Sequence, residues 1–145
     1  MLFGFLLSFA KSYNPDDFNI KTFAACPDQA TQFFAIKKFN VYHPLNTRGL
    51  ALQITLVAEL SQKVQEPYLE IQLLNQRIPI LRKKDLLCRP GILICPASFS
   101  QLVYGVSMPM PSTIPLGEYK LRFIFKEGTK RLSCYETPIT LKKLE

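Results

Sequence analysis

The chain has 145 residues, which suits one domain with one core, and its 48% apolar and 12% aromatic content excludes a disordered polymer. Its net charge of +7 favours anionic partners such as lipid headgroups, nucleic acid or acidic glycans. The basic residues form no continuous basic helix and do not alternate with stacking aromatics, so we do not expect nucleic-acid binding. No apolar run approaches the length that spans a bilayer.

The first residues are almost wholly apolar, in the stretch MLFGFLLSFA, and Ser8-Phe9-Ala10 offers small residues where a signal peptidase cleaves. The stretch is short and lacks a basic start. We interpret residues 1–12 as a signal peptide, short or truncated at its beginning, in preference to an ordinary first strand. Residues 13–145 then form a single domain. Four cysteines, an even number, agree with an oxidising compartment.

Three strands are expected between residues 32 and 75. Gln32–Val41 is the first, and a turn-rich connection, His43–Gly49, leads to the second. From Leu50 to Leu60 apolar residues occupy every second position, which is typical of a half-buried strand. Residues 67–75 alternate in the same way. We predict that the last two runs pair as antiparallel neighbours.

The second half continues the strand pattern. Residues 77–81 are apolar but interrupted by Pro79, which predicts an edge segment. Alternation at 102–108 and 119–125, a hairpin turn at 127–130 and a final strand at 131–143 complete the series. About seven strands without a convincing helix predict an all-β, immunoglobulin-like sandwich, although the chain has no Trp.

A cysteine loop holds the most informative motif, Cys88-Arg-Pro-Gly-Ile-Leu-Ile-Cys95-Pro96, in which Pro90-Gly91 indicates a tight loop closed by a disulfide. Zinc binding is not expected, because C-x-x-C is absent and His43 is the only histidine. Other motifs follow in order. They are Cys26-Pro27, Phe39-x-Val41-Tyr42, Pro115-x-Gly117-x-Tyr119 and Leu132-x-Cys134-Tyr135-Glu136-x-Pro138.

In this order the motifs resemble the ML-domain family of lipid-recognition proteins, over about residues 24–143. The resemblance implies two sheets splayed apart, with an apolar cavity for lipid between them. It also implies disulfides between Cys26 and Cys134 and between Cys88 and Cys95, and a place in the secreted or endolysosomal lumen. The expected ligand is a sterol or a phospholipid, carried by a monomer that meets anionic membranes transiently and also a membrane receptor or transporter.

Catalysis is not expected, and no metal or other cofactor is implied. Gly105-Val106-Ser107-Met108-Pro109 lacks the second glycine of a nucleophile elbow, and His43 fits a surface turn. Glu59 and Glu70 fall on outward strand positions, and we assign Glu136 a structural role. The alternative to a lipid carrier is an immunoglobulin-like interaction module that recognises a receptor or a lipid-bearing ligand without transfer.

The predicted lipid site combines inward strand positions with two apolar segments that prolines keep from completing a sheet, Ile78-Pro79-Ile80 and Met108–Pro115, which we expect to form the mouth. A closed core is the competing interpretation, and it holds in part for Leu52, Ile54 and Leu56. The predicted lipid-binding residues are Ile54, Leu56, Leu73, Ile78, Pro79, Ile80, Val106, Met108, Met110, Ile114, Pro115, Leu121 and Phe123. Arg82, Lys83, Lys84 and Arg89 are expected to dock on anionic membrane, or else to form a solvated loop.

Overall fold

The structure is a computed structural model, and it describes residues 19–29, 31–42 and 51–141. The predicted signal peptide, residues 1–12, and His43 with its connection lie outside the described residues. Within the described ranges every regular element is a strand, and no helix there could cross a membrane.

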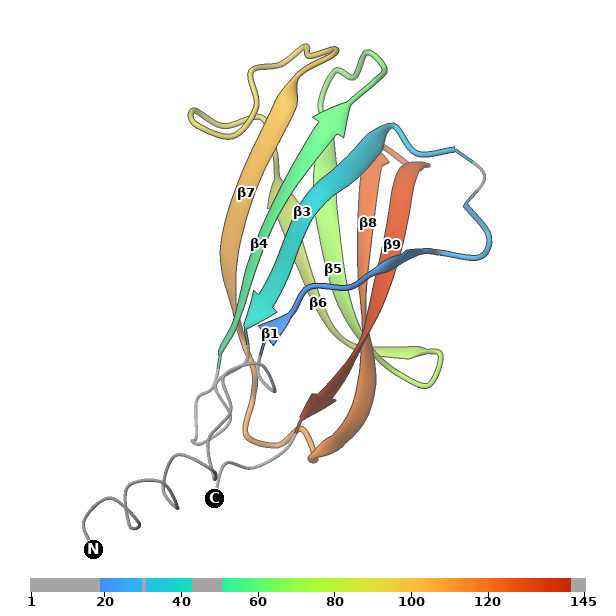
Figure 1. The fold of residues 1–145 in the computed structure, drawn as a ribbon, viewed down its shortest axis with the longest axis vertical. Helices are drawn as coiled ribbons and strands as arrows, with labels where there is room; N and C mark the ends of the chain where they lie inside the picture. The colour runs from blue at the N-terminus through green and yellow to red at the C-terminus, as the bar shows by residue number, and fades with distance from the viewer. Residues whose placement is uncertain (1–18, 30, 43–50, 142–145) are drawn as a thin grey trace, which may run out of the picture.

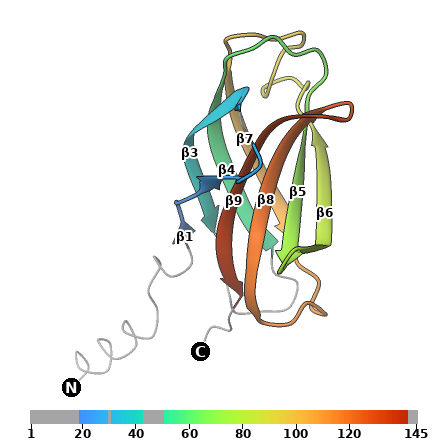
Figure 2. The same cartoon turned by 90° about the vertical axis from the view of Figure 1, so that its right-hand side faces the viewer.

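In the part of the chain that the structure describes, nine strands form two antiparallel sheets that enclose one core (Figures 1 and 2). The first sheet has the order β1-β3-β4-β7 and the second the order β2-β9-β8-β5-β6. Seven of the strands are long, so the predicted all-β sandwich of about seven strands is confirmed. The bounds are β1 (Asn19–Ile20), β2 (Ala24–Ala25), β3 (Phe34–Tyr42), β4 (Ala51–Leu60), β5 (Tyr68–Asn75), β6 (Ile78–Leu86), β7 (Gln101–Pro109), β8 (Gly117–Glu127) and β9 (Lys130–Leu141).

Two expectations about the strands need correction. β4 pairs with β3 and β7 rather than with β5, because residues 61–67 carry the chain into the second sheet, where β5 lies between β6 and β8. Alternation shows that one face of a strand is buried, but it does not identify the neighbouring strand. The segment at 77–81 does lie on an edge strand, but β6 continues to Leu86 and includes the basic run Arg82–Lys84.

The core forms where the inner faces of the two sheets meet. Along β4 every second side chain from Leu52 to Leu60 is buried, as the alternation predicts. Aromatic pairs join the sheets: the rings of Phe34 and Phe125 stack with centroids 4.6 Å apart, and Phe39 meets Phe123 edge-on at 5.3 Å. Each such pair contributes roughly 0.5–1.5 kcal/mol beyond the burial of its surface.

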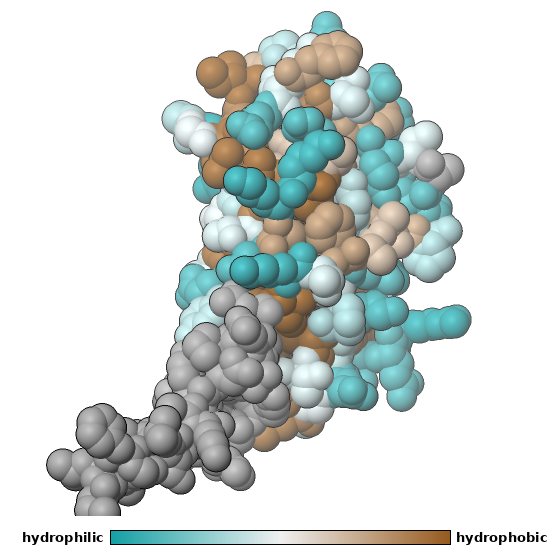
Figure 3. Space-filling view, viewed as in Figure 1, coloured by the Kyte–Doolittle hydropathy of each residue, from teal (hydrophilic) through white to brown (hydrophobic). Residues whose placement is uncertain are grey.

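The face of the molecule seen in Figure 3 carries hydrophilic side chains with apolar patches between them. On the second sheet Arg122 holds Glu136 at 2.6 Å, and Lys126 holds Glu70 at 3.3 Å. Burial alone would raise the pKa of Glu70, but hydrogen bonds from Gln72 and Lys126 outweigh it and lower that pKa. The Glu70 carboxylate is therefore held charged in its ion pair on the sheet surface.

One side of the sandwich is closed by the segment Asn19–Cys26, which we call the strap. Its β1 pairs with β3 of the first sheet and its β2 pairs with β9 of the second, so it crosses from one sheet to the other (Figure 1). Between these pairings the Phe23 ring lies edge-on against Phe39 and Tyr135, with centroids 5.4 and 5.6 Å apart. The strap thus covers this side of the core with an aromatic ring.

Hydrogen bonds reinforce the same side. The side-chain amide of Gln32 both donates to the Cys134 carbonyl and accepts from the Cys134 amide, at 3.3 and 3.1 Å, as a neighbouring strand would. The Phe34 amide donates to Ser133 Oγ at 2.8 Å, and the Tyr135 hydroxyl donates to the Phe34 carbonyl. The backbone groups of Phe34 and Cys134 are therefore satisfied across the junction.

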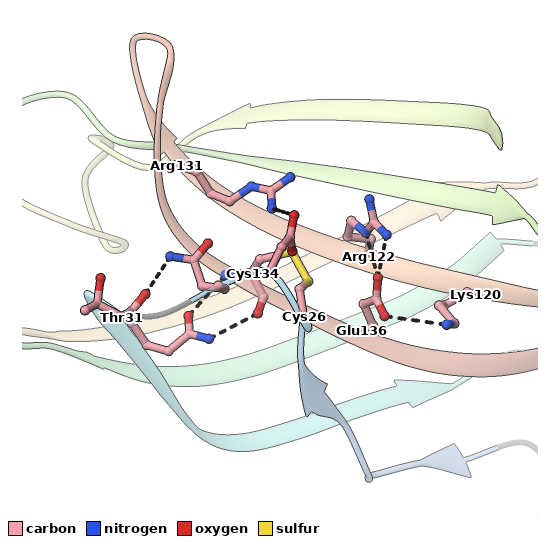
Figure 4. The surroundings of a disulfide bond; sticks show 10 residues. Cys26, Thr31, Lys120, Arg122, Arg131, Cys134 and Glu136 are labelled. Atoms are coloured by element: carbon pink, nitrogen blue, oxygen red, sulfur yellow. Dashed lines mark hydrogen bonds and ion pairs between the residues drawn. A yellow bond between two sulfur atoms is a disulfide. The ribbon is translucent and has the colours of Figure 1, made fainter. Parts of the chain in front are cut away.

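Both predicted disulfides are present. Cys26 is bonded to Cys134 with Cα atoms 5.3 Å apart, and Cys88 to Cys95 with Cα atoms 5.6 Å apart, which leaves no free cysteine. Figure 4 shows the first bond fixing the strap to β9, beside the Glu136 carboxylate held by Arg122 and Lys120. The longer bridge therefore reinforces the strapped side covalently.

The two bridges should differ in their contribution to stability. They close loops of 108 and 7 residues of sequence separation, so chain entropy predicts about 4–5 kcal/mol for the first and about 2–3 kcal/mol for the second. Urea denaturation of the paired serine variants C26S/C134S and C88S/C95S measures both. A larger loss for the short loop would show that the strap does not depend on its covalent bond.

Candidate functional site

On the side opposite the strap, far fewer interactions join the two sheets. The backbones of opposite sheets approach most closely at β3 and β9, whereas β6 and β7 are the free edge strands of their sheets. Among the described residues, one side-chain hydrogen bond crosses there: the Tyr104 hydroxyl donates to Asp85 Oδ2 at 2.6 Å. The other carboxylate oxygen of Asp85 lies 3.2 Å from Arg89. The sandwich is thus closed on one side and lightly held on the other.

This side, between the edge strands β6 and β7, we call the seam. It has an apolar inner lining, with charged residues near the end of β6. The register aligns Leu81, Lys83 and Asp85 of β6 with the inward residues of β5, and Leu81 is half-buried against the core. Tyr104 and Val106 contribute from β7, Tyr104 fully and Val106 partly buried. Leu81 was not among the predicted lipid-binding residues, although its alternation with Lys83 and Asp85 indicates an inward position.

Most of the predicted lipid-binding residues line the core in this structure. Those on β4, β5 and β8, and Met108 on β7, are almost fully buried, and Met110 is 6% exposed. Val106 and Ile114 are half-buried against the core. The structure therefore brings together the strand positions that were predicted to line the site. The nearly inaccessible members are Ile54, Leu56, Leu73, Met108, Leu121 and Phe123.

The two predicted mouth segments lie at the same end of the sandwich, where β6 begins and β7 ends (Figures 1 and 2). Ile78 and Ile80 are 65% and 41% exposed, and Pro79 is half-buried. Pro115 is exposed in the connection that follows β7. This end of the molecule therefore presents apolar side chains to solvent beside the buried Met110.

The four predicted docking residues do not form one patch beside that end. Register and alternation place Arg82 and Lys84 on the outer face of β6 and Lys83 on its inner face. Lys84 Nζ lies 4.2 Å from the centre of the Tyr68 ring. Arg89 lies beyond the other end of β6, in the cysteine loop. Charges on an exposed edge strand also prevent unwanted strand pairing, so β6 has a structural reason to be basic.

Burial dominates the electrostatics of the seam. It raises the pKa of Tyr104 far above its usual value, and the hydrogen bond to Asp85 adds to this effect. Burial also raises the pKa of Tyr135 on the strapped side. Both hydroxyls are therefore uncharged hydrogen-bond donors over the physiological range, and each holds a group on the opposite sheet.

The carboxylates considered for catalysis are in ion pairs. Glu59 meets Lys37 at 3.8 Å, in addition to the pairs of Glu70 and Glu136 described above. Ser107 is exposed and accepts a hydrogen bond from Gln53. In the described part of the chain no three His, Cys, Asp or Glu side chains gather as metal ligands.

Comparison with known proteins agrees with this architecture. The family model of the ML domain matches residues 21–141. A Niemann-Pick type C2 protein from the Japanese carpenter ant is similar in structure, with a TM-score of 0.65 and 13% identity, over 83% of this chain and 99% of that one. Chicken MD-1 complexed with lipid IVa has a TM-score of 0.52 and 18% identity, over 85% and 90%. No curated protein sequence matches significantly.

The hydrogen bond across the seam should be measurable. Tyr104→Phe should lower the free energy of unfolding at neutral pH by about 1–2 kcal/mol, because it removes the donor to Asp85 Oδ2 and leaves Asp85 with Arg89 alone. Because the pKa of Tyr104 is raised on folding, the folded protein keeps this proton to a higher pH than the unfolded protein does. This stabilisation is full below about pH 10 and is lost as the pH rises further, so wild type and variant should converge there.

Urea denaturation at several pH values tests this, with Tyr68→Phe as the control, because Tyr68 makes an exposed hydrogen bond to Gly128. Amide exchange in β6 should also accelerate in Tyr104→Phe while β3 and β9 keep their protection. Uniform acceleration in all strands would contradict a local role at the seam.

Proposed function

Because this chain belongs to the ML-domain family, we propose that it is a non-catalytic lipid-binding protein that holds the apolar part of a sterol or phospholipid between its two sheets. It delivers this lipid to membranes or to a partner protein, in the secreted or endolysosomal lumen. The protein acts as a monomer with one lipid.

The observation that carries the proposal is the unequal closure of the two sides. The strapped side is fixed by a disulfide and several hydrogen bonds, whereas one hydrogen bond spans the seam among the described residues. β6 and β7 can therefore part while the strap keeps the sheets joined. Burial of apolar surface releases about 25 cal/mol per Å², so a tail between Leu81 and Val106 gains several kcal/mol.

The walls of the seam suit a hydrocarbon ligand. They are aliphatic and aromatic, and Met108 and Met110 adapt to ligands of different shape. The structure of chicken MD-1 complexed with lipid IVa supports the proposal, because a protein of this fold binds a lipid there. Lys83, on the inner face of β6, is placed to meet an anionic headgroup at the rim.

A second candidate function is an interaction module. Ile94 and Phe99, in the connection between β6 and β7, are 85% and 83% exposed. Phe99 has φ of 50°, a backbone conformation that costs a bulky residue energy. Two exposed apolar side chains on a disulfide-closed loop and its continuation are suited to contact a receptor.

Charges placed near the mouth should separate lipid binding from folding. Ile114→Asp should abolish binding of a fluorescent lipid while the protein stays folded, because the half-buried side chain can turn its charge to water. Met110→Asp should instead unfold or strongly destabilise the protein, because Met110 is buried. Lipid titration beside a thermal melt measures both effects.

Leu86→Asp is the matched control, since Leu86 is exposed at the opposite end of β6. It should keep both the fold and lipid binding. Full lipid binding by Ile114→Asp would refute the position of the mouth, and loss of binding in Leu86→Asp would show that the charge acts nonspecifically.

Membrane docking should depend on the basic residues of β6. Lipid transfer between anionic vesicles should slow as salt rises, because exposed charges are screened beyond about 10 Å at 0.1 M. Arg82→Glu with Lys84→Glu should slow transfer to anionic vesicles and leave transfer to neutral ones unchanged. Equal transfer by variant and wild type at low salt would assign these residues to edge protection alone.

A further inference from the structure

A second hollow lies on the outer face of the first sheet, away from the core. It is a groove of about 640 Å³ that crosses β3, β4 and β7 and reaches the strap at Lys21 and Phe23. Figure 3 looks onto the molecule from the side on which these strands lie in front, and shows apolar surface between hydrophilic side chains. Its volume falls in the range of small-molecule sites.

The floor of the groove is apolar because of two neighbouring rows of the sheet. One row aligns Val57 with Val103, and the next aligns Thr55 with Gly105. Gly105 has no side chain, which leaves space beside the Thr55 methyl group. Val103 is 56% exposed. The solvent face of an antiparallel sheet is usually polar, so this floor needs a reason other than the core.

The rim of the groove on the β3 side is positively charged. A register shift between Ile36 and Lys38 interrupts the alternation of β3, so that the consecutive residues Lys37 and Lys38 are both exposed. Lys37 is paired with Glu59, but neither Lys38 nor Lys21 forms an ion pair within the described ranges. Anions are therefore favoured at this end of the groove.

Asn40 supplies a third recognition element. It lines the groove from β3, and its side-chain oxygen is buried without a hydrogen-bond donor in the described structure. That oxygen is almost fully shielded from solvent, so it can meet a ligand hydroxyl only when the Asn40 side chain turns toward the groove, which would give it the partner that buried polar atoms normally have.

We propose that this groove binds an anionic lysophospholipid, that is, a single acyl chain on a glycerol phosphate. The chain lies over Val57, Val103 and the gap at Gly105, the free glycerol hydroxyl donates to Asn40, and the phosphate lies between Lys21 and Lys38. The site is separate from the space between the sheets and does not depend on a lipid being held there. It gives the protein an outer contact for anionic single-chain lipids.

The test is a titration of ¹⁵N-labelled protein with 1-decanoyl lysophosphatidic acid below its micelle concentration. The amide chemical shifts of Thr55, Val57, Val103 and Gly105 should change with lipid concentration and reach a plateau. Lysophosphatidylcholine of the same chain length should bind more weakly, and the shifts with glycerol 3-phosphate, which has no chain, should not saturate. Saturable shifts limited to inward residues such as Ile54 and Leu121 would overturn the proposal.

Gly105→Val is the decisive variant. A Cβ at Gly105 would meet Thr55 Cγ2 at 3.7 Å, an ordinary contact, and the backbone there is not in the left-handed region, so the variant folds. Its side chain fills the floor and should remove the saturable shifts. Ser107→Val adds a similar side chain two residues along the same face of β7, outside the groove lining, and should bind as wild type.

Charge variants test the rim. Lys21→Gln and Lys38→Gln should each weaken binding about two- to fivefold and reduce its salt dependence. Lys63→Gln, outside the groove, should change nothing. Wild-type affinity in Gly105→Val, or equal affinity for lysophosphatidic acid and lysophosphatidylcholine, would refute the site whether or not lipid binds between the sheets.

Discussion

The junction between β9 and the first sheet is the constraint on which the architecture depends. Two stacked sheets need a connection that fixes their spacing, and here it is concentrated at one side, in the strap, the Cys26–Cys134 bridge and the bonds to Phe34. The same elements cover the edge of β9, which would otherwise expose unpaired backbone groups. The sheets are therefore held at a fixed side, and whatever separates them acts on the other.

That other side has to satisfy two opposing requirements. It must bury apolar side chains such as Leu81 and Val106, and it must remain separable if a ligand is to enter. A hydrogen bond between the buried Tyr104 hydroxyl and Asp85 meets both, because it aligns the edge strands without covalent closure. Charged residues on β6 add protection, since an edge strand with inward Lys83 is a poor template for another strand.

The sequence predicts the elements better than it predicts their neighbours. Period-two alternation from Leu52 to Leu60 identified β4, but pairing with β5 was wrong, because a strand with one buried face fits any partner that shares the core. The Pro90-Gly91 turn indicated the Cys88–Cys95 bond, and motif resemblance supplied the Cys26–Cys134 bond, whereas periodicity could supply neither. Gln32, whose amide replaces a strand at Cys134, carried no sequence signal, because this contact joins residues far apart in the chain. The seam residue Leu81 was missed because Pro79, two residues earlier, made the segment look like an interrupted edge rather than the start of an alternating strand.

One strand, β7, connects the two candidate sites. Tyr104 and Val106 face the seam, and the alternate residues Val103 and Gly105 face the outer groove. Side chains on opposite faces of a strand do not share contacts, so substitutions on one face act on one site as long as the backbone is unchanged. An event that parts β7 from β6 would move the whole strand, however, and would couple the groove to the seam through the backbone they share.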